Sequence, residues 1–84
     1  MEKICLQSCY HKKDAEILCQ KNNTTIKEVV LDNINDIIIA LQNISKKIEN
    51  NERAINEDWV KAAYPMNSIM NALGNAWYLD DEKE

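Results

Sequence analysis

The chain has 84 residues, a formal net charge of −4 and 45% apolar residues, with only one glycine and one proline. Hairpin sheets need turn residues, so this composition argues against an all-β fold, and the apolar content argues against disorder. A domain this short buries only about 60% of the surface that its unfolded chain exposes, and a second copy would add stability. We therefore expect a single all-α domain over residues 1–84.

The first segment, residues 1–23, contains all three cysteines and the only histidine. Asp14 is a residue type that caps helix N-termini, and the short helix that it predicts would end at Asn22 and Asn23. An extended arm could precede this helix, because short apolar runs do not distinguish helix from strand. The sequence thus predicts a short N-terminal segment that is helical or irregular.

The second segment predicts a long helix over residues 25–49. Thr25 and Glu28 have the spacing of a capping box, in which each side chain accepts from the other residue's backbone N–H. Polar residues such as Asn33 are expected to face water, whereas Ile39 is either an ordinary exposed residue or a contact with a second chain. Apolar residues that alternate in steps of four and three form one stripe, and these are Val30, Ile34, Ile37, Leu41, Ile44 and Ile48.

Asn50 and Asn51 mark the predicted turn between two long helices. Asparagine tolerates the left-handed conformation that ends a helix and also caps the helix that follows. One continuous helix is the alternative, because Ile48 and Ile55 stand seven residues apart. Its stripe would then pass through Asn51 and Glu52, so the pattern favours an antiparallel helical hairpin.

The third segment predicts a second helix over residues 52–79. Pro65 should kink or restart it, because proline cannot donate to the carbonyl four residues earlier. Two pieces, 52–63 and 65–79, and one bent rod both satisfy the pattern. Gly74 costs about 1 kcal/mol against alanine in a helix interior, which suggests that another helix approaches closely there.

A second apolar stripe follows this third segment at the same helical spacing. Its members are Ile55, Trp59, Ala62, Met66, Ile69, Leu73 and Ala76. An isolated pair of helices leaves part of each stripe in water, so we expect two hairpins to pair as a dimeric helical bundle. In outline this topology resembles that of small plasmid-encoded four-helix-bundle regulators, a likeness that does not transmit function.

Cys5, Cys9, His11 and Cys19 are the one set of residues with the composition of a zinc site. The spacing fits poorly, because structural zinc sites use pairs two to four residues apart that are separated by a dozen residues or more. We therefore expect small buried cysteines, a solvated histidine and no metal or other cofactor. A metal- or redox-responsive regulator built on this set is the alternative function.

Other chemistry is not indicated. The chain has no glycine-rich phosphate loop, HExxH motif or nucleophile elbow, so we do not expect an enzyme. Basic residues adjoin only at Lys12-Lys13 and Lys46-Lys47, which makes direct nucleic-acid binding unexpected. The acidic tail 80–84 is a solvated end or a contact for a basic partner. Without a signal sequence or a long apolar stretch, we expect a cytoplasmic protein outside the membrane.

The aromatic residues of the third segment carry the functional hypothesis. Val60, Tyr64 and Tyr78 lie on a face outside the predicted stripe, and tyrosine is enriched at binding surfaces. The sequence thus predicts a small non-enzymatic interaction protein, of the phage or plasmid accessory type, that inhibits or adapts a host macromolecule. In the alternative, residues 1–23 fold back and cover this face with Ile4, Leu6, Ile17 and Leu18.

Overall fold

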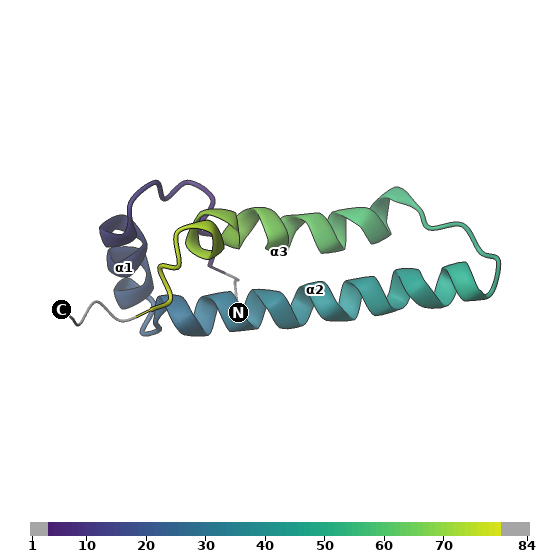
Figure 1. Cartoon of the computed structure of the whole chain (residues 1–84), viewed down its shortest axis with the longest axis horizontal. Helices are drawn as coiled ribbons and strands as arrows, with labels where there is room; N and C mark the ends of the chain where they lie inside the picture. The colour runs from purple at the N-terminus through teal and green to yellow at the C-terminus, as the bar shows by residue number, and fades with distance from the viewer. Residues whose placement is uncertain (1–3, 80–84) are drawn as a thin grey trace.

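The protein is a helical hairpin with a third, shorter helix at one end (Figure 1). The computed structural model describes residues 4–79, and within that range it contains three helices and no strand. Helix α1 spans Lys12–Lys21, α2 spans Ile26–Glu49 and α3 spans Asn56–Gly74. Helices α2 and α3 pack against each other in antiparallel orientation, and α1 lies across the end away from their connecting turn. The predicted all-α hairpin is confirmed, and the continuous helix is excluded.

Helix α2 begins at Ile26, directly after the N-cap Thr25 of the predicted capping box. The Glu28 N–H donates to Thr25 Oγ1 over 3.1 Å, and the Thr25 N–H donates to Glu28 Oε1 over 3.2 Å. Helix α1 lacks such a signal: it begins two residues before Asp14, with His11 at the N-cap and no side-chain cap. The prediction that Asp14 caps α1 was therefore wrong, and Asp14 lies in the first turn instead, where an acidic residue complements the helix dipole.

All three helices end in the same motif, with one residue in the left-handed region. These residues are Asn23, Asn51 and Ala76, with φ values of 57°, 59° and 52°. In each case the N–H of the next residue returns to a carbonyl five positions earlier, as from Trp77 to Ala72 over 2.9 Å. Asparagine favours this conformation and alanine does not, so the first two helix ends follow from the sequence and the third does not.

Helix α3 is shorter than the predicted range 52–79 and is not divided at Pro65, which lies in its interior. Its first turn is fixed by Asp58, whose Oδ2 accepts from the Ile55 N–H over 2.9 Å. The expectation of a close helix approach at Gly74 was also wrong, because a Cβ placed there would meet nothing within 4 Å.

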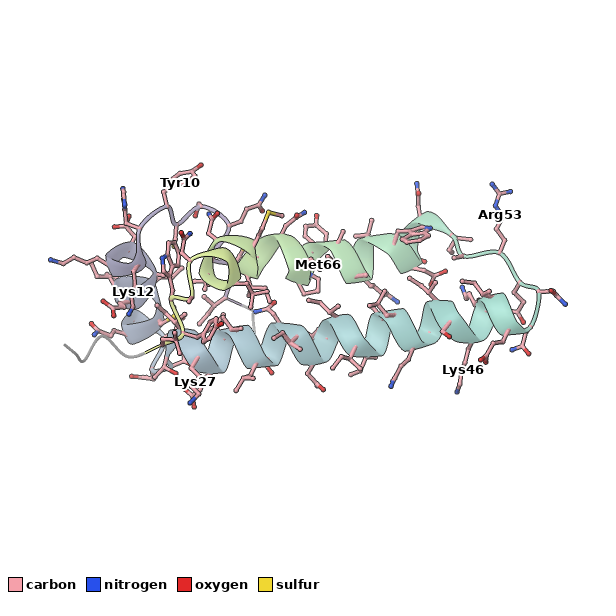
Figure 2. The ribbon with its side chains drawn as sticks, viewed as in Figure 1. Tyr10, Lys12, Lys27, Lys46, Arg53 and Met66 are labelled. Atoms are coloured by element: carbon pink, nitrogen blue, oxygen red, sulfur yellow. The ribbon has the colours of Figure 1, made fainter. Side chains whose placement is uncertain are left out.

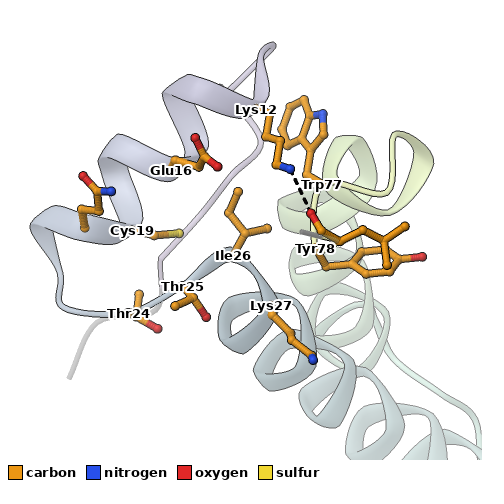
Figure 3. Close-up of a pocket in the computed structure, with 11 residues that line it drawn as sticks. Lys12, Glu16, Cys19, Thr24, Thr25, Ile26, Lys27, Trp77 and Tyr78 are labelled. Carbon is orange, nitrogen blue, oxygen red and sulfur yellow. Dashed lines mark hydrogen bonds between the residues drawn. The ribbon is translucent and has the colours of Figure 1, made fainter. Parts of the chain in front are cut away.

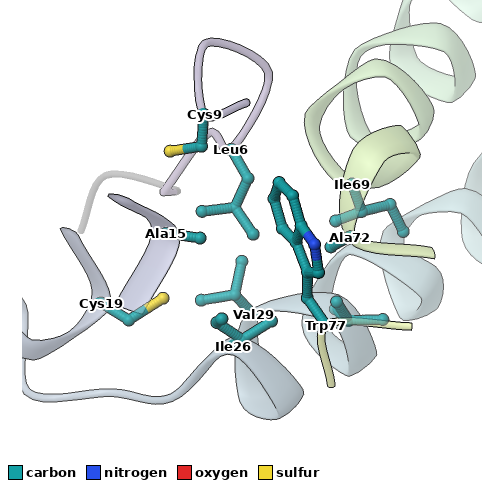
Figure 4. Packing of buried hydrophobic residues seen from close by; sticks show 10 residues of the cluster. Leu6, Cys9, Ala15, Cys19, Ile26, Val29, Ile69, Ala72 and Trp77 are labelled. Atoms are coloured by element: carbon teal, nitrogen blue, oxygen red, sulfur yellow. The ribbon is translucent and has the colours of Figure 1, made fainter. Parts of the chain in front are cut away.

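The hydrophobic core lies where α1 and the segment before it meet the hairpin (Figure 4). Leu6 and Ile69 are completely buried. The Leu6 N–H donates to the Ser68 carbonyl and hydroxyl over 3.1 and 3.2 Å, which holds the N-terminal segment along α3. Ten buried residues form this cluster: Leu6, Cys9, Ala15, Cys19, Ile26, Val29, Val30, Ile69, Ala72 and Trp77. We call this region the core end of the hairpin.

The opposite end, beside the connecting residues 50–55, is held differently, and we call it the turn end. Ile44 and Ala62 are buried there, next to the buried carboxylate of Asp58. Lys47 Nζ donates to Asp58 Oδ2 over 2.7 Å, and Asn43 Nδ2 donates to Asp58 Oδ1 over 3.1 Å. The hydrogen bonds from Lys47 and from the Ile55 N–H lower the pKa of Asp58.

The buried faces of the long helices only partly match the predicted stripes. Val30, Ile44, Ala62 and Ile69 are buried as expected, but Asn33, which was expected to face water, is also buried. Small or polar residues line the contact, and these include Asn33, Ala40, Pro65, Ser68 and Ala72. Small side chains let two helices approach closely, which turns the bulkier residues outward. Six predicted core residues are therefore exposed: Leu41, Ile48, Ile55, Trp59, Met66 and Leu73.

Candidate interaction surfaces

The structure separates the three residues predicted to bind a partner. Val60 and Tyr64 lie one turn apart on α3 and are exposed, Tyr64 by 71%. Tyr78 follows α3 and lies in a different pocket, beside α1 and the start of α2 (Figure 3). The N-terminal segment reaches Ser68 on this side of α3 and leaves Tyr64 uncovered. Residues 1–23 therefore fold back onto this face only in part, at Asn71, whose Nδ2 donates to the Cys9 carbonyl over 3.0 Å, and they leave Val60, Tyr64 and Tyr78 exposed.

The pocket beside Tyr78 measures about 380 Å³ and is formed where α1, α2 and the residues after α3 meet (Figure 3). Lys12 Nζ donates to the Leu79 carbonyl over 2.9 Å and ties the C-terminal turn to α1. Glu16 and Lys27 also line the pocket, so charges of both signs border it. This arrangement fastens chain segments together and gives Tyr78 a structural environment unlike that of Tyr64.

The four residues weighed as zinc ligands divide between the core and the surface. Cys9 and Cys19 are buried, while Cys5 and His11 are exposed. Burial raises the pKa of the Cys9 and Cys19 thiols, with smaller contributions from the nearby Asp14 carboxylate at Cys9 and from Cys9 at Cys19. A raised pKa disfavours the thiolate that binds metals or reacts with oxidants. Within residues 4–79 no group of three or more His, Cys, Asp or Glu side chains is arranged to hold a metal ion.

Helix α2 carries an exposed apolar stripe, which shares Ile34, Leu41 and Ile48 with the stripe predicted to be buried. Leu31, Ile38, Leu41 and Ile48 are 47% to 65% exposed, and Ile34, between the first two, is half-buried. Their spacing again alternates in steps of three and four, with Ser45 completing the series between the last two. The helix therefore has two apolar stripes, of which only one contacts α3.

Helix α3 has a matching exposed stripe. Trp59, Met66, Met70 and Leu73 are 44% to 59% exposed, and Ala63 completes the series. Scattered apolar residues are normal on a protein surface, but a series that runs along a helix at a constant helical phase is not scattered.

Helical geometry places both stripes on the same side of the hairpin. At 3.6 residues per turn, each stripe is rotated by roughly 100° from the buried face of its own helix, in the same sense. Because the helices are antiparallel, equal rotations in the same sense reach the same side of the pair. We call this side the apolar face, defined by Leu31, Ile38, Leu41, Ile48, Trp59, Met66, Met70 and Leu73.

The other side of the hairpin contains a groove of about 550 Å³, which we call the Tyr64 groove. Ile39, Ala40 and Pro65 contribute apolar walls, and Ile4 and Cys5 of the N-terminal segment also line it. On each helix, its lining residues are rotated from the buried face in the sense opposite to the exposed apolar stripe. The groove and the apolar face therefore lie on different sides of the hairpin. The lining residues are Ile4, Cys5, Asn33, Asp36, Ile39, Ala40, Lys61, Tyr64, Pro65 and Ser68.

Neither side belongs to a membrane-spanning element, since no helix within residues 4–79 is long and apolar enough to cross a bilayer. The chain matches no protein-family model, and no curated protein or solved structure matches it significantly.

Proposed function

We propose that this protein is a non-enzymatic interaction protein whose hairpin pairs with a second copy through the apolar face, forming a four-helix bundle. One observation carries the proposal: both long helices present an exposed apolar stripe, and both stripes lie on the same side. Stripes with this spacing pack against other helices, and antiparallel hairpins that pair face to face build such bundles.

The size of the apolar face supports a stable pair. Over the 19 residues of α3, a rise of 1.5 Å per residue gives a length of roughly 28 Å. Two helices side by side are roughly 18 Å wide, so the face covers about 500 Å² per copy and about 1,000 Å² in the pair. Since accessible area exceeds this flat projection, the pair reaches the size of specific protein interfaces, about 1,000 Å² or more.

The dimer leaves Tyr64 and Val60 available on the other side of each hairpin. We propose that this side contacts a host macromolecule, which the protein inhibits or adapts in the manner of a phage or plasmid accessory protein. A tyrosine that is 71% exposed offers a large contact area, little loss of side-chain entropy and a hydrogen-bonding tip. Tyr78, in its separate pocket, is not part of this contact.

The dimer is tested by light scattering coupled to gel filtration, with Leu41→Asp as the disrupting variant. The wild type should elute with twice the chain mass of 9.7 kDa. An aspartate in the apolar face would be buried without a partner, and it should weaken association by more than about a hundredfold. Because Leu41 is half exposed within one chain, the variant should stay helical as a monomer.

Ile39→Asp is the matched control, since Ile39 has a similar exposure on the same helix but lies on the other side. This variant should remain dimeric. A wild type that elutes at the single-chain mass at high protein concentration would contradict the dimer. Equal dissociation of both variants would show that association does not use the apolar face.

The host contact is tested separately by affinity capture from a host lysate with mass spectrometry. Replacement of Tyr64 by alanine should reduce capture of the enriched partner at least about tenfold, as expected for the loss of a central aromatic contact. Tyr10→Ala is the control, because Tyr10 is 76% exposed but points away from both helices at the core end (Figure 2). Equal capture by the wild type, Tyr64→Ala and Tyr10→Ala would contradict a role for Tyr64.

A further inference from the structure

We propose that the Tyr64 groove binds an indole, in the form of a tryptophan side chain presented by a partner protein. The proposal rests on the proposed function in one respect, that this side of α3 contacts a partner, and it adds the chemistry of the group that is bound. It is independent of the dimer, because the groove and the apolar face lie on opposite sides of the hairpin.

The walls of the groove fit a flat apolar ring. Ile39 and Ala40 from α2 face Tyr64 and Pro65 from α3 across the groove. Its volume of about 550 Å³ exceeds that of one aromatic side chain, so a neighbouring part of the partner can enter with it. The Tyr64 ring can stack on an incoming aromatic ring, which adds to the apolar contact.

Asn33, which lines the groove, has a buried acceptor that receives no hydrogen bond from the described residues. Asn33 is only 4% exposed, and its Nδ2 donates to the Val29 carbonyl of its own helix over 2.7 Å. No hydrogen bond from residues 4–79 reaches its Oδ1. A buried polar atom that lacks a partner is costly, so a ligand that brings a donor to this position is favoured over one that does not.

A second acceptor comes from the backbone of α3. Pro65 has no N–H, so the Lys61 carbonyl lacks the donor that an ordinary residue four positions later would supply. Lys61 and Pro65 both line the groove, on the side of α3 that faces Asn33. Asp36 and Lys61 add one charge of each sign to the lining. Among the apolar walls, the buried Asn33 Oδ1 calls for a donor, and an indole supplies one N–H on a flat aromatic ring without being an acceptor.

Binding is tested by NMR titration of the labelled full-length chain with N-acetyltryptophanamide. Its 1-methyl derivative is the matched probe, since it keeps the ring and loses only the N–H. Saturable shifts should appear at groove residues, including the Asn33 side-chain amide, and the 1-methyl probe should bind about tenfold more weakly. Equal affinity of the two probes, or shifts confined to the apolar face, would overturn the proposal.

Two variants assign the contacts. Tyr64→Ala should weaken the first probe about fivefold or more, whereas Tyr10→Ala should leave it unchanged. Asn33→Leu removes the acceptor, so the difference between the two probes should shrink to less than about twofold. A difference that persists in folded Asn33→Leu would overturn the role of Asn33. If Asn33→Leu does not fold, the affinities of the two probes for the wild type and for Tyr64→Ala test the proposal instead.

Three further outcomes separate this inference from others. If neither probe binds while Tyr64→Ala loses the host partner, the indole proposal fails and the proposed function stands. If groove signals instead shift with protein concentration and this dependence disappears in Trp59→Phe, the occupant is Trp59 of a second copy, and a partner tryptophan is overturned. Probe binding without any host capture supports the groove and contradicts the host contact.

Discussion

The core end and the turn end of the hairpin contain the same two helices but are stabilised by different means. At the core end, α1 and Leu6 supply a third layer, and ten buried residues form one cluster. At the turn end, small side chains and the Asp58 network join α2 and α3 alone. Two helices bury only a narrow line of contact each. Where no third layer exists within the chain, apolar side chains remain available for another molecule.

The two ends should differ most in the free energy of unfolding that is lost when a buried side chain is shortened. Leu6→Ala should destabilise the protein by about 3 kcal/mol, since the completely buried side chain is surrounded by three elements that cannot all relax. Ile44→Ala should cost about 2 kcal/mol, because the more open turn end can partly close the space. Urea unfolding followed by circular dichroism at one protein concentration measures both. Equal costs would show that the ends are equally well packed.

The features that were predictable from the sequence are local ones. The capping box at Thr25 and Glu28 and the asparagines at the turn specify their own backbone conformation, so both ends of α2 followed from a few residues. The end of α3 was missed because Ala76 occupies a position that favours asparagine or glycine.

The choice of buried face was not predictable in the same way. Helix α2 has two apolar stripes, and periodicity alone does not say which one meets α3. The structure selects the stripe that contains Asn33 and Ala40, because small residues allow close packing, and leaves Leu41 outside. The Tyr64 groove was also beyond sequence reasoning, since its walls come from three separate segments.

The rate at which each cysteine thiol reacts with a reagent measures how well the core end is closed to solvent. Cys5 is exposed and should react with a thiol reagent at once. Cys9 and Cys19 should react more than about tenfold more slowly, since burial limits access and raises the pKa of both thiols, which lowers the thiolate fraction. Mass spectrometry of the alkylated protein over time identifies each site. Fast reaction of Cys19 in the folded protein would show that the core end opens readily.

The acid response tests the turn end. Because the pKa of Asp58 is lowered in the folded state, the unfolded state binds its proton more readily. The contribution of Asp58 is therefore complete above the ordinary value of 3.8 and is lost as the pH falls below it. Asp58→Asn should be less stable than the wild type at neutral pH, and this gap should narrow in acid. Glu57→Gln, which changes an exposed neighbouring carboxylate, is the matched control.

The left-handed end of α3 offers a stabilising change at the core end. Ala76 has a φ of 52°, a region that costs residues with a Cβ roughly 1 kcal/mol. Ala76→Gly should remove this cost, offset in part by the greater freedom of glycine in the unfolded chain, for a net gain of about 0.5 to 1 kcal/mol. The midpoint of urea unfolding should rise without a change in slope. A loss of stability would show that the Ala76 methyl group packs favourably in the core.

Gly74→Ala should have the smallest effect. Gly74 is the last residue of α3, its φ is not positive, and an added Cβ would meet nothing within 4 Å. Alanine should therefore stabilise the helix by about 0.5 kcal/mol, less than at a mid-helix position because the last turn is only partly helical. Gly74 lies near Met70 and Leu73, at the edge of the apolar face. The gain should thus appear equally at low and high protein concentration, since an edge position tolerates one methyl group. If the gain is present in dilute protein and disappears as copies associate, the second hairpin approaches α3 more closely than a Cβ allows, and Gly74 belongs to the centre of the interface.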